Sequence, residues 1–541
     1  MFIKKIILYS NTIKYLRFKQ FFYRLRRYFP RNNPSILSSS TLADVPLKWC
    51  INKNYKKKEL LNSDEIILLN LKGKRREWSS STKSLLWEYH TNYFDFASDL
   101  LTEQEAMSVQ KDMLNWVESN TDYNRTPWDP YPTSLRIVNW IKYYLNGNPI
   151  QQKIIDSTAT QASYLYKNIE YDLYGNHLFR NAKALCFAGV LIKNKESVKW
   201  LEKGKEILAC EIKEQILKDG GNFELSPMYH SNIIEDMLDL VNLIKAFNLN
   251  EFREILEGLV EVLPKSLNWL DKMCHPDKGL SFFNDSVLNA SMSLEDLKNY
   301  ANVLEIKLKH NNESGTFFLK ESGYAIIRNK KLNLICDTGL IGPDYMPGHS
   351  HADCLSFELS IDNQRIFVNS GTSEYDNSAE RIMQRKTYSH NTVSIDNLDS
   401  SEVWQSFRVA RRAYPLSTEV RDNFIFSSIN GFKKNFKSRI HSRQWELKEN
   451  KLYIKDVIKG SSSIAKAYFY IHPQIEVAVL QSNYLELKYM NEFMCRIKFL
   501  NGDVSINDSF WYPEFGKKEK NKSLVVTFFE GNLTSIIELK K

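Results

Sequence analysis

Apolar residues recur every three or four positions between about residues 60 and 306. One such stripe runs along residues 233–244, and the next runs along residues 252–263. This spacing places the apolar side chains on one face of a helix. Turn-forming residues such as Asn146-Gly147-Asn148-Pro149 separate the periodic segments. The pattern therefore predicts many medium-length helices joined by short turns and packed as antiparallel pairs.

The pattern changes after the polar stretch 309–315, where short runs rich in β-branched and aromatic residues begin. Examples are Tyr324-Ala325-Ile326-Ile327, Arg365-Ile366-Phe367-Val368 and Val525-Val526-Thr527-Phe528. Segments that carry Gly, Asn, Asp and Ser separate these runs, as antiparallel sheets require. The expected fold class is therefore α+β and multidomain, with a helical half followed by an antiparallel β-sandwich.

The N-terminal segment has a different character from both halves. Residues 1–31 hold nine Lys or Arg and no acid, interleaved with aromatic residues such as Phe18, Phe21 and Phe22. Such a segment can lie on an anionic membrane surface, or it can pack its aromatic side chains on the protein body and keep its charges in water. The expected domains are a basic arm at 1–55, a helical domain at 56–308 and a β-sandwich at 316–541.

Composition and charge narrow the functional classes only slightly. The 541 residues are 43% hydrophobic and 25% charged, which excludes disordered, collagen-like and small disulfide-rich chains. The formal net charge of +9 suits an acidic partner without indicating a nucleic-acid binder. The seven cysteines are scattered and form no C-x-x-C pair, and we see neither a membrane-spanning run nor a cleavable export signal.

Three titratable residues follow one another at alternate positions in Gly348-His349-Ser350-His351-Ala352-Asp353. In an extended strand His349, His351 and Asp353 would point to the same face. A solvated strand face explains them equally well. Because His390 and the oxygen-bearing residues around Asn369 belong to the same expected β region, a metal site with two histidines is a second interpretation.

The helical half contains two further candidate segments. In Gly175-Asn176-His177 a turn leads into a helix, where Asn176 can act as a plain N-cap and His177 as a structural histidine, or both can be fixed hydrogen-bond donors. A loop punctuated by Gly and Pro holds Tyr229 just before the next helix. A tyrosine at this place is either packed in the core or available for chemistry.

Taken together, these segments resemble the heparinase II/III-like family of polysaccharide lyases over most of the chain. The motifs that carry the resemblance are Trp128-Asp129-Pro130-Tyr131-Pro132 with Arg136 and Asn139-Trp140, the Asn176-His177 segment, Ser226-Pro227-Met228-Tyr229, Phe283-Asn284-Asp285-Ser286, the stretch 348–353, and His390-Asn391-Thr392-Val393. The resemblance implies an α/α toroid before the β-sandwich, with the active site between them.

The resemblance also implies roles for individual residues. Asn176 and His177 would neutralise a uronate carboxylate, Tyr229 would act as base and acid, and His349 would be a second catalytic histidine. β-Elimination removes the C5 proton of a uronic acid, so the adjacent carboxylate must lose negative character before carbanion charge spreads into it. A tyrosine with a usual pKa near about 10 needs neighbouring cations, for which His177, His349 and Arg385 are candidates.

Substrate-binding and metal-binding residues complete the candidate set. Trp128, Tyr131 and Arg136 are expected to form a wall that stacks on sugars and holds carboxylates, and Arg385 is a further expected substrate-binding residue. The resemblance implies that His351, Asn369 and His390 hold a structural zinc ion. The family often has Asp at the position of Asn369, and a neutral amide is a weaker zinc ligand than a carboxylate.

The leading functional hypothesis is therefore a lyase that cleaves an acidic, uronate-containing polysaccharide by β-elimination. One alternative is a helical-toroid glycoside hydrolase, for which Glu224 and Asp285 are the candidate carboxylates. Another alternative is a non-catalytic glycan-binding protein of polysaccharide assembly. The resemblance suggests the periplasm or cell envelope, and the sequence does not specify the polysaccharide, the mode of cleavage or the oligomeric state.

Overall fold

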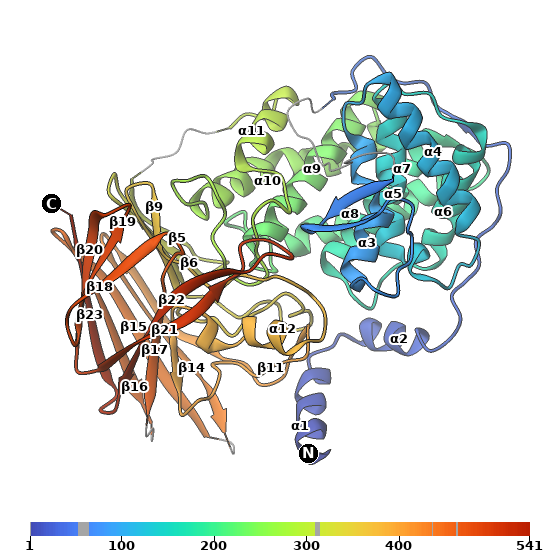
Figure 1. Ribbon diagram of the computed structural model, residues 1–541. Coiled ribbons are helices and arrows are strands. Elements are labelled where there is room, and N and C mark those ends of the chain that lie inside the picture. The colour runs from blue at the N-terminus through green and yellow to red at the C-terminus, as the bar shows by residue number, and fades with distance from the viewer. Residues whose placement is uncertain (1, 52–63, 309–313, 435–436, 461–463, 541) are drawn as a thin grey trace.

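The computed structural model describes residues 2–51, 64–308, 314–434, 437–460 and 464–540. A helical half is followed by a β half (Figure 1), so the predicted fold class is confirmed. The predicted boundary between residues 55 and 56 lies outside the described residues.

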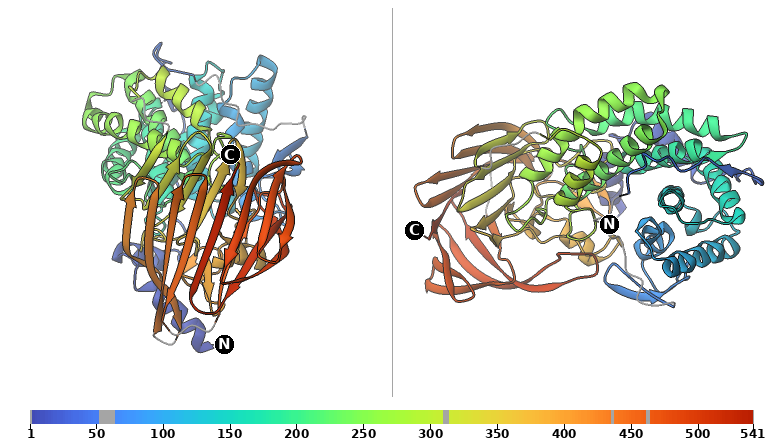
Figure 2. Two further views of the ribbon diagram at one scale, coloured as in Figure 1. Left: turned by 90° about the vertical axis from the view of Figure 1, so that its left-hand side faces the viewer. Right: turned by 90° about the horizontal axis from the view of Figure 1, so that it is seen from above.

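The helical half consists of helices arranged along a curve, which is visible in the view from above (Figure 2). Helix α9 shows how the sequence starts such an element, because the Ser226 side chain accepts the Tyr229 N–H at 3.2 Å and Pro227 follows as the first helical residue. The apolar residues of its predicted stripe, from Ile233 to Ile244, are buried. The helices are α3 (Leu85–Tyr93), α4 (Glu103–Ser119), α5 (Pro130–Leu145), α6 (Gln152–Lys167), α7 (Gly175–Leu191), α8 (Ser197–Gln215), α9 (Pro227–Phe247), α10 (Arg253–Lys272) and α11 (Leu294–Val303).

The β half has two layers of antiparallel strands around a shared apolar core. One layer is an eight-stranded sheet, with the order β13 (Tyr414–Arg421), β14 (Phe424–Lys434), β15 (Lys437–Lys448), β16 (Lys451–Lys459), β23 (Asn532–Leu539), β20 (Glu492–Leu500), β19 (Tyr484–Tyr489) and β18 (Ile475–Gln481). In strand β16 buried positions alternate with exposed or half-buried ones, as a strand with one face on the core requires.

The second layer combines a five-stranded and a four-stranded sheet. Their strands are β5 (Gly315–Leu319), β6 (Tyr324–Arg328), β7 (Leu332–Asp337), β8 (Phe357–Ile361) and β9 (Gln364–Phe367), and β10 (Val393–Ile395), β17 (Ala465–Tyr470), β22 (Glu519–Phe528) and β21 (Asp503–Trp511). A β-bridge between Phe367 and Ile471 joins the two sheets. The five-stranded sheet faces the helical half.

The two halves share a buried interface. Trp269 of α10 donates its indole N–H to Ser322 at 2.8 Å, and Tyr324 of β6 donates its hydroxyl to the Leu225 carbonyl at 2.7 Å. Apolar side chains from both halves, among them Phe283 and Ile335, form one cluster around them. Such packing fixes the relative position of the loops that carry the candidate site.

Two short helices of the N-terminal arm lie outside both halves. They are α1 (Phe2–Ile13) and α2 (Phe18–Arg26), and Figure 1 shows them beside the junction of the two halves. The chain then runs along the helical half, where Arg31 forms an ion pair with Asp129.

A buried ion cluster ties the eight-stranded sheet to the other layer. The Arg443 guanidinium on β15 forms two hydrogen bonds with Asp456 on β16, at 2.7 and 3.1 Å. It also donates to the carbonyls of Leu355 and Asn391, and all of its side chain is buried. Removing one partner of such a cluster leaves an uncompensated charge in the core.

We therefore expect Arg443→Met to lower the free energy of unfolding by about 3–5 kcal/mol, because Asp456 then stays buried without its cation. Urea denaturation followed by circular dichroism measures this loss. Lys451→Met is the matched control, because it removes an exposed lysine whose partner is Glu538, and it should leave the stability nearly unchanged. Equal stabilities of the two variants would contradict the expectation.

Candidate active site

The start of helix α7 is a strained turn. Tyr174 and Gly175 both have positive φ angles, of 62° and 57°. A Cβ on Gly175 would collide with the side chains of Met346 and Glu224, and the positive φ angle would strain any other residue, so glycine is favoured here. Tyr174 is the N-cap residue, which corrects the prediction that Asn176 caps this helix. The Asn176 side chain is thereby free of a capping role.

Asn176 and His177 occupy the first turn of α7 and contact a common neighbour. The Asn176 side-chain amide lies 3.3 Å from the Tyr131 hydroxyl, and the His177 ring packs on the Tyr131 ring at 4.2 Å. The backbone N–H of Asn176 donates to Glu224 Oε1 at 3.2 Å. The predicted substrate-binding residue Tyr131 therefore lies next to both predicted catalytic residues.

His177 is oriented by a buried carboxylate. Its Nδ1 lies 3.1 Å from Glu170 Oε1, and Asn181, one turn later on the same helix face, donates to Glu170 Oε2 at 3.1 Å. Burial raises the pKa of Glu170, but His177 and these hydrogen bonds hold it below its usual value. Glu170 is therefore ionised near neutral pH and fixes the imidazole.

Tyr229, in the first turn of α9, lies against His349. Their rings stack at 3.8 Å with an interplanar angle of 29°. The Tyr229 hydroxyl forms a 3.0 Å hydrogen bond with the Tyr375 hydroxyl. Burial and the neighbouring Tyr375 raise the pKa of Tyr229 well above its usual value, so its hydroxyl carries a proton in the free protein.

The Asp285 carboxylate joins the two halves at the centre of the site. It accepts hydrogen bonds from His349 Nδ1 at 3.0 Å and His351 Nε2 at 2.8 Å. Both guanidinium NH2 groups of Arg381, on the short helix α12 (Ala379–Gln384), bind it at 2.5 and 2.8 Å. Burial raises the pKa of Asp285, but Arg381 and the two histidines hold it well below its usual value.

The segment 348–353 is a loop rather than the expected strand, because β8 begins only at Phe357. The two histidines nevertheless meet, since each binds a different oxygen of Asp285. Asp353 does not join them: it accepts the backbone N–H of Asn284 at 3.1 Å. The prediction of a shared strand face is therefore wrong, although the convergence of His349 and His351 is correct.

Glu224 and Asp285, the two carboxylates considered for a glycoside hydrolase, lie on either side of the His349 ring. His349 Nδ1 contacts Asp285, and its Nε2 lies 3.7 Å from Glu224 Oε2. Asp285 is completely buried and is bound by Arg381, so it is not exposed to attack a sugar or to activate a water. Burial raises the pKa of Glu224, although His349 opposes this effect. This arrangement does not provide two opposed carboxylates on either side of a substrate.

Two residues of the predicted sugar-binding wall lie elsewhere. Trp128 is only 3% exposed and packs against Trp116 and Tyr164. Arg136 is fully buried, where it donates to Gln161 and to the Asn92 carbonyl. Both belong to the core of the helical half, so the prediction that they face a substrate is corrected.

Arg385 has a similar structural role. It is fully buried and donates to the carbonyls of Ser350 and Gln405, at 2.8 Å in each case. It thereby shapes the loop that carries His349 and His351. The prediction that Arg385 contacts the substrate is therefore wrong. Arg180, which donates to the Tyr131 hydroxyl at 2.5 Å, is the cation at this part of the site.

His351 and His390 have the geometry of a metal-binding pair. His351 Nε2 faces Asp285, and His390 Nδ1 donates to the Lys386 carbonyl at 2.8 Å. Burial lowers the pKa of His351 to about 4 and that of His390 well below its usual value, so both rings are neutral. Their remaining nitrogens face each other at 3.0 Å, each with a lone pair. The donor chemistry of the two rings therefore fits a cation between them.

The third predicted ligand, Asn369, is engaged differently. Its side-chain oxygen accepts the backbone N–H of Asn391 at 3.0 Å. Within the described part of the chain, no group of three or more His, Cys, Asp or Glu side chains is arranged to hold a metal.

The sequence-based reasoning missed Tyr375, Arg381 and Glu170. Two of them lie far in sequence from their partners: Tyr375 is 146 residues from Tyr229, and Arg381 is 96 residues from Asp285. No local spacing signals such pairs. Glu170 carries the one usable signal, because it lies seven residues before His177 in the turn that enters α7.

Comparison with known proteins places this site in a family context. The chain is 28% identical over 262 residues to a heparin-sulfate lyase of Bacteroides stercoris, which covers 43% of this chain and 38% of that protein. It is 26% identical over 362 residues to a heparin-sulfate lyase of Pedobacter heparinus, which covers 59% of this chain and 53% of that protein. The matches thus span about half or less of these curated relatives.

The fold is also found among solved structures. A crystal structure of heparinase III matches with a TM-score of 0.68 at 18% identity, over 95% of this chain and 88% of that one. A heparan sulfate lyase from Pedobacter heparinus matches with a TM-score of 0.57 at 18% identity, over 85% and 78% of the two chains. At these identities the likeness concerns the fold.

Family models cover both halves of the chain. The model described as "Heparinase II/III N-terminus" matches residues 84–309, and the model described as "Heparinase II/III-like, C-terminal" matches residues 312–538. The resemblance inferred from the sequence motifs is thereby confirmed, and the chain belongs to the heparinase II/III family.

Proposed function

We propose that the protein is a polysaccharide lyase that cleaves an acidic, uronate-containing polysaccharide by β-elimination. The observation that carries this proposal is a continuous chain of contacts among the four candidate catalytic residues. Asn176 binds Glu224, Glu224 faces His349, and His349 stacks on Tyr229. His177 joins this chain through Tyr131. The names of the relatives make heparan sulfate the first substrate to test.

The first turn of α7 supplies the groups that neutralise a carboxylate. Backbone N–H groups and the positive end of the helix dipole favour an anion at this place. The Asn176 amide and the His177 ring stand at the same turn, and His177 keeps 24% of its side chain exposed. As the C5–H bond breaks, charge develops on the carboxylate, and fixed donors stabilise it more strongly than in the ground state.

Tyr229 is the proton-transfer group in this proposal. Its hydroxyl bonds another hydroxyl, that of Tyr375, and its ring lies against His349. His349 keeps 14% of its side chain exposed and is fixed by Asp285, so it can hold its orientation while it meets the substrate. For this step Tyr229 first loses its hydroxyl proton to solvent and reacts as a phenolate, which takes the proton from C5. Tyr229 then gives that proton to the oxygen at C4 as the C4–O bond breaks, so the products are an unsaturated uronate and a glycan fragment with a free hydroxyl.

A panel of uronate polysaccharides distinguishes this function from the two alternatives. A lyase produces ultraviolet absorbance from the new double bond, whereas a hydrolase produces reducing ends without that absorbance. Binding without turnover on every member of the panel identifies a glycan-binding protein and rejects the proposal.

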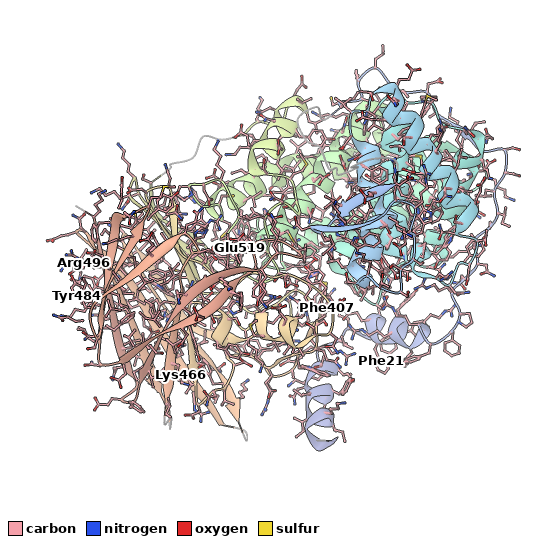
Figure 3. All side chains as sticks on the ribbon, in the orientation of Figure 1. Phe21, Phe407, Lys466, Tyr484, Arg496 and Glu519 are labelled. Carbon is pink, nitrogen blue, oxygen red and sulfur yellow. The ribbon has the colours of Figure 1, made fainter. Side chains whose placement is uncertain are left out.

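One prediction concerns Tyr229, the proposed catalytic base. Tyr229→Phe should lower turnover by at least about 10²-fold, because only the hydroxyl that transfers the proton is removed. Substrate binding, measured by isothermal calorimetry, should persist. Tyr484→Phe is the matched control, since Figure 3 shows Tyr484 on the distant β19 strand. Near wild-type turnover in Tyr229→Phe rejects this role.

Another prediction concerns the neutralisation of the uronate carboxylate. Asn176→Ala and His177→Ala should each lower kcat by about 10²- to 10³-fold, with a smaller change in KM, because these donors act mainly on developing charge. Steady-state kinetics on one defined uronate polysaccharide separate the two parameters. A rise in KM at constant kcat would instead assign both residues to substrate binding.

We also propose a structural zinc ion held by His351 and His390, with Asn369 or water completing its coordination. The support is the pair of facing lone pairs, each fixed by a hydrogen bond on the opposite side of its ring. The ion would replace a repulsive contact between two lone pairs with two coordinate bonds. It would stabilise the junction between the β half and the loop of Asp285.

Elemental analysis tests this proposal directly. His351→Ala and His390→Ala should each lose the metal and lower the thermal unfolding temperature, because metal binding contributes to the stability of the folded state. His349→Ala should keep the metal and lose activity. A metal-free wild type rejects the site, and metal loss in His349→Ala alone would show that the two neighbouring histidines have exchanged roles.

A further inference from the structure

Helix α2 exposes its apolar face to solvent. The exposed fraction is 84% for Phe18, 44% for Phe21, 56% for Phe22 and 48% for Leu25. They stand at positions i, i+3, i+4 and i+7, which form one stripe on a helix. The polar Gln20 on the opposite side is fully buried. A helix of a soluble protein normally has the reverse orientation.

The inward side of the arm is held by specific contacts with both halves. Gln20 donates its side-chain N–H to the Tyr345 carbonyl at 3.1 Å, and the Arg17 guanidinium lies 3.7 Å from the Tyr345 ring. The Tyr23 ring packs on Tyr171 of the helical half at 5.0 Å. These contacts fix which face of α2 points outward, and Figure 3 shows the labelled Phe21 at the outer edge of this helix.

Helix α1 extends the same exposed surface. Thr12 donates its hydroxyl to the Val409 carbonyl at 3.3 Å, and Tyr9 packs on Trp404 at 4.8 Å, so α1 lies on the β11–β12 hairpin (Val403–Trp404 and Arg408–Val409). Other apolar side chains between residues 5 and 29 are exposed, namely Ile6, Ile7, Ile13, Phe18, Phe21, Phe22, Leu25, Tyr28 and Phe29.

The charge of the arm indicates what covers this surface. The first 43 residues contain nine Lys or Arg and no acid, and Lys5, Lys14 and Arg24 are exposed. A second copy of the chain would bring an equally basic arm to the contact, and like charges oppose that association. An anionic lipid surface offers the opposite charge, and its interfacial region accepts exposed aromatic side chains.

We propose that α1 and α2 dock the protein on the surface of a bilayer that contains anionic phospholipids. The exposed aromatic stripe enters the interfacial layer, and the flanking cations contact the headgroups. Among the described residues no helix has the length and hydropathy needed to cross a bilayer.

Sedimentation with vesicles tests the proposal. The full chain should bind vesicles of phosphatidylcholine with about one-third phosphatidylserine, and high salt should weaken this binding because it screens the headgroup charge. The combined change Phe18→Ser, Phe21→Ser and Phe22→Ser should lower the partition coefficient at least about tenfold, because buried aromatic area is lost. The lyase assay should be unaffected, since these residues lie outside the catalytic cluster.

The matched control is Val479→Ser, Met490→Ser and Phe529→Ser, which removes exposed apolar residues from the β half. It should bind vesicles like the wild type. If the triple phenylalanine variant fails to fold, a second variant takes its place in the test. It combines Lys5→Gln, Lys14→Gln and Arg24→Gln, and it should lose the preference for vesicles with phosphatidylserine. Equal affinity for vesicles with and without phosphatidylserine, or an arm-dependent dimer that ignores vesicles, overturns the proposal.

Discussion

The carboxylate of Asp285 is the constraint on which the site depends. It follows α10 in the helical half, yet His349, His351 and Arg381, which bind it, all belong to the β half. A carboxylate without exposure is costly unless it is paired and fully hydrogen-bonded, and here three partners satisfy both oxygens. The candidate catalytic cluster therefore forms only when the two halves are docked, and the interface around Trp269 and Tyr324 keeps them docked.

The segments that carry the candidate site include residues in strained backbone conformations. Tyr174, Leu225, Asn284 and Leu355 all have positive φ angles, although none of them is glycine. Asn284 shows what stabilises such a residue, because its side chain donates to the Leu225 carbonyl at 2.9 Å and accepts the His351 N–H at 2.9 Å. Strained conformations persist where surrounding contacts determine them. These contacts place Glu224, Asp285 and His349 around one another before any substrate binds.

The sequence predicts the two halves because their hydrophobic periods differ, 3.6 in one and 2 in the other. Its motifs also make Asn176, His177, Tyr229 and His349 candidate catalytic residues, although only the resemblance assigns them a common site. Burial is the property that it fails to predict. Trp128, Arg136 and Arg385 have the chemistry of sugar-binding residues, but three-dimensional packing places them in cores. Aromatic and guanidinium groups suit both environments, so the residue type alone does not tell whether the side chain lines a substrate-binding surface or lies in the protein interior.

The arm and the catalytic cluster are connected by one loop. Gln20 binds the carbonyl of Tyr345, and the next residue, Met346, is the side chain that restricts position 175 at the start of α7. Tyr345 also donates its hydroxyl to Glu214 at the end of α8. The orientation of α2 is therefore fixed relative to the first turn of α7. Because that turn carries Asn176 and His177, a protein docked through α2 presents its active site in one defined orientation to the surface beneath it.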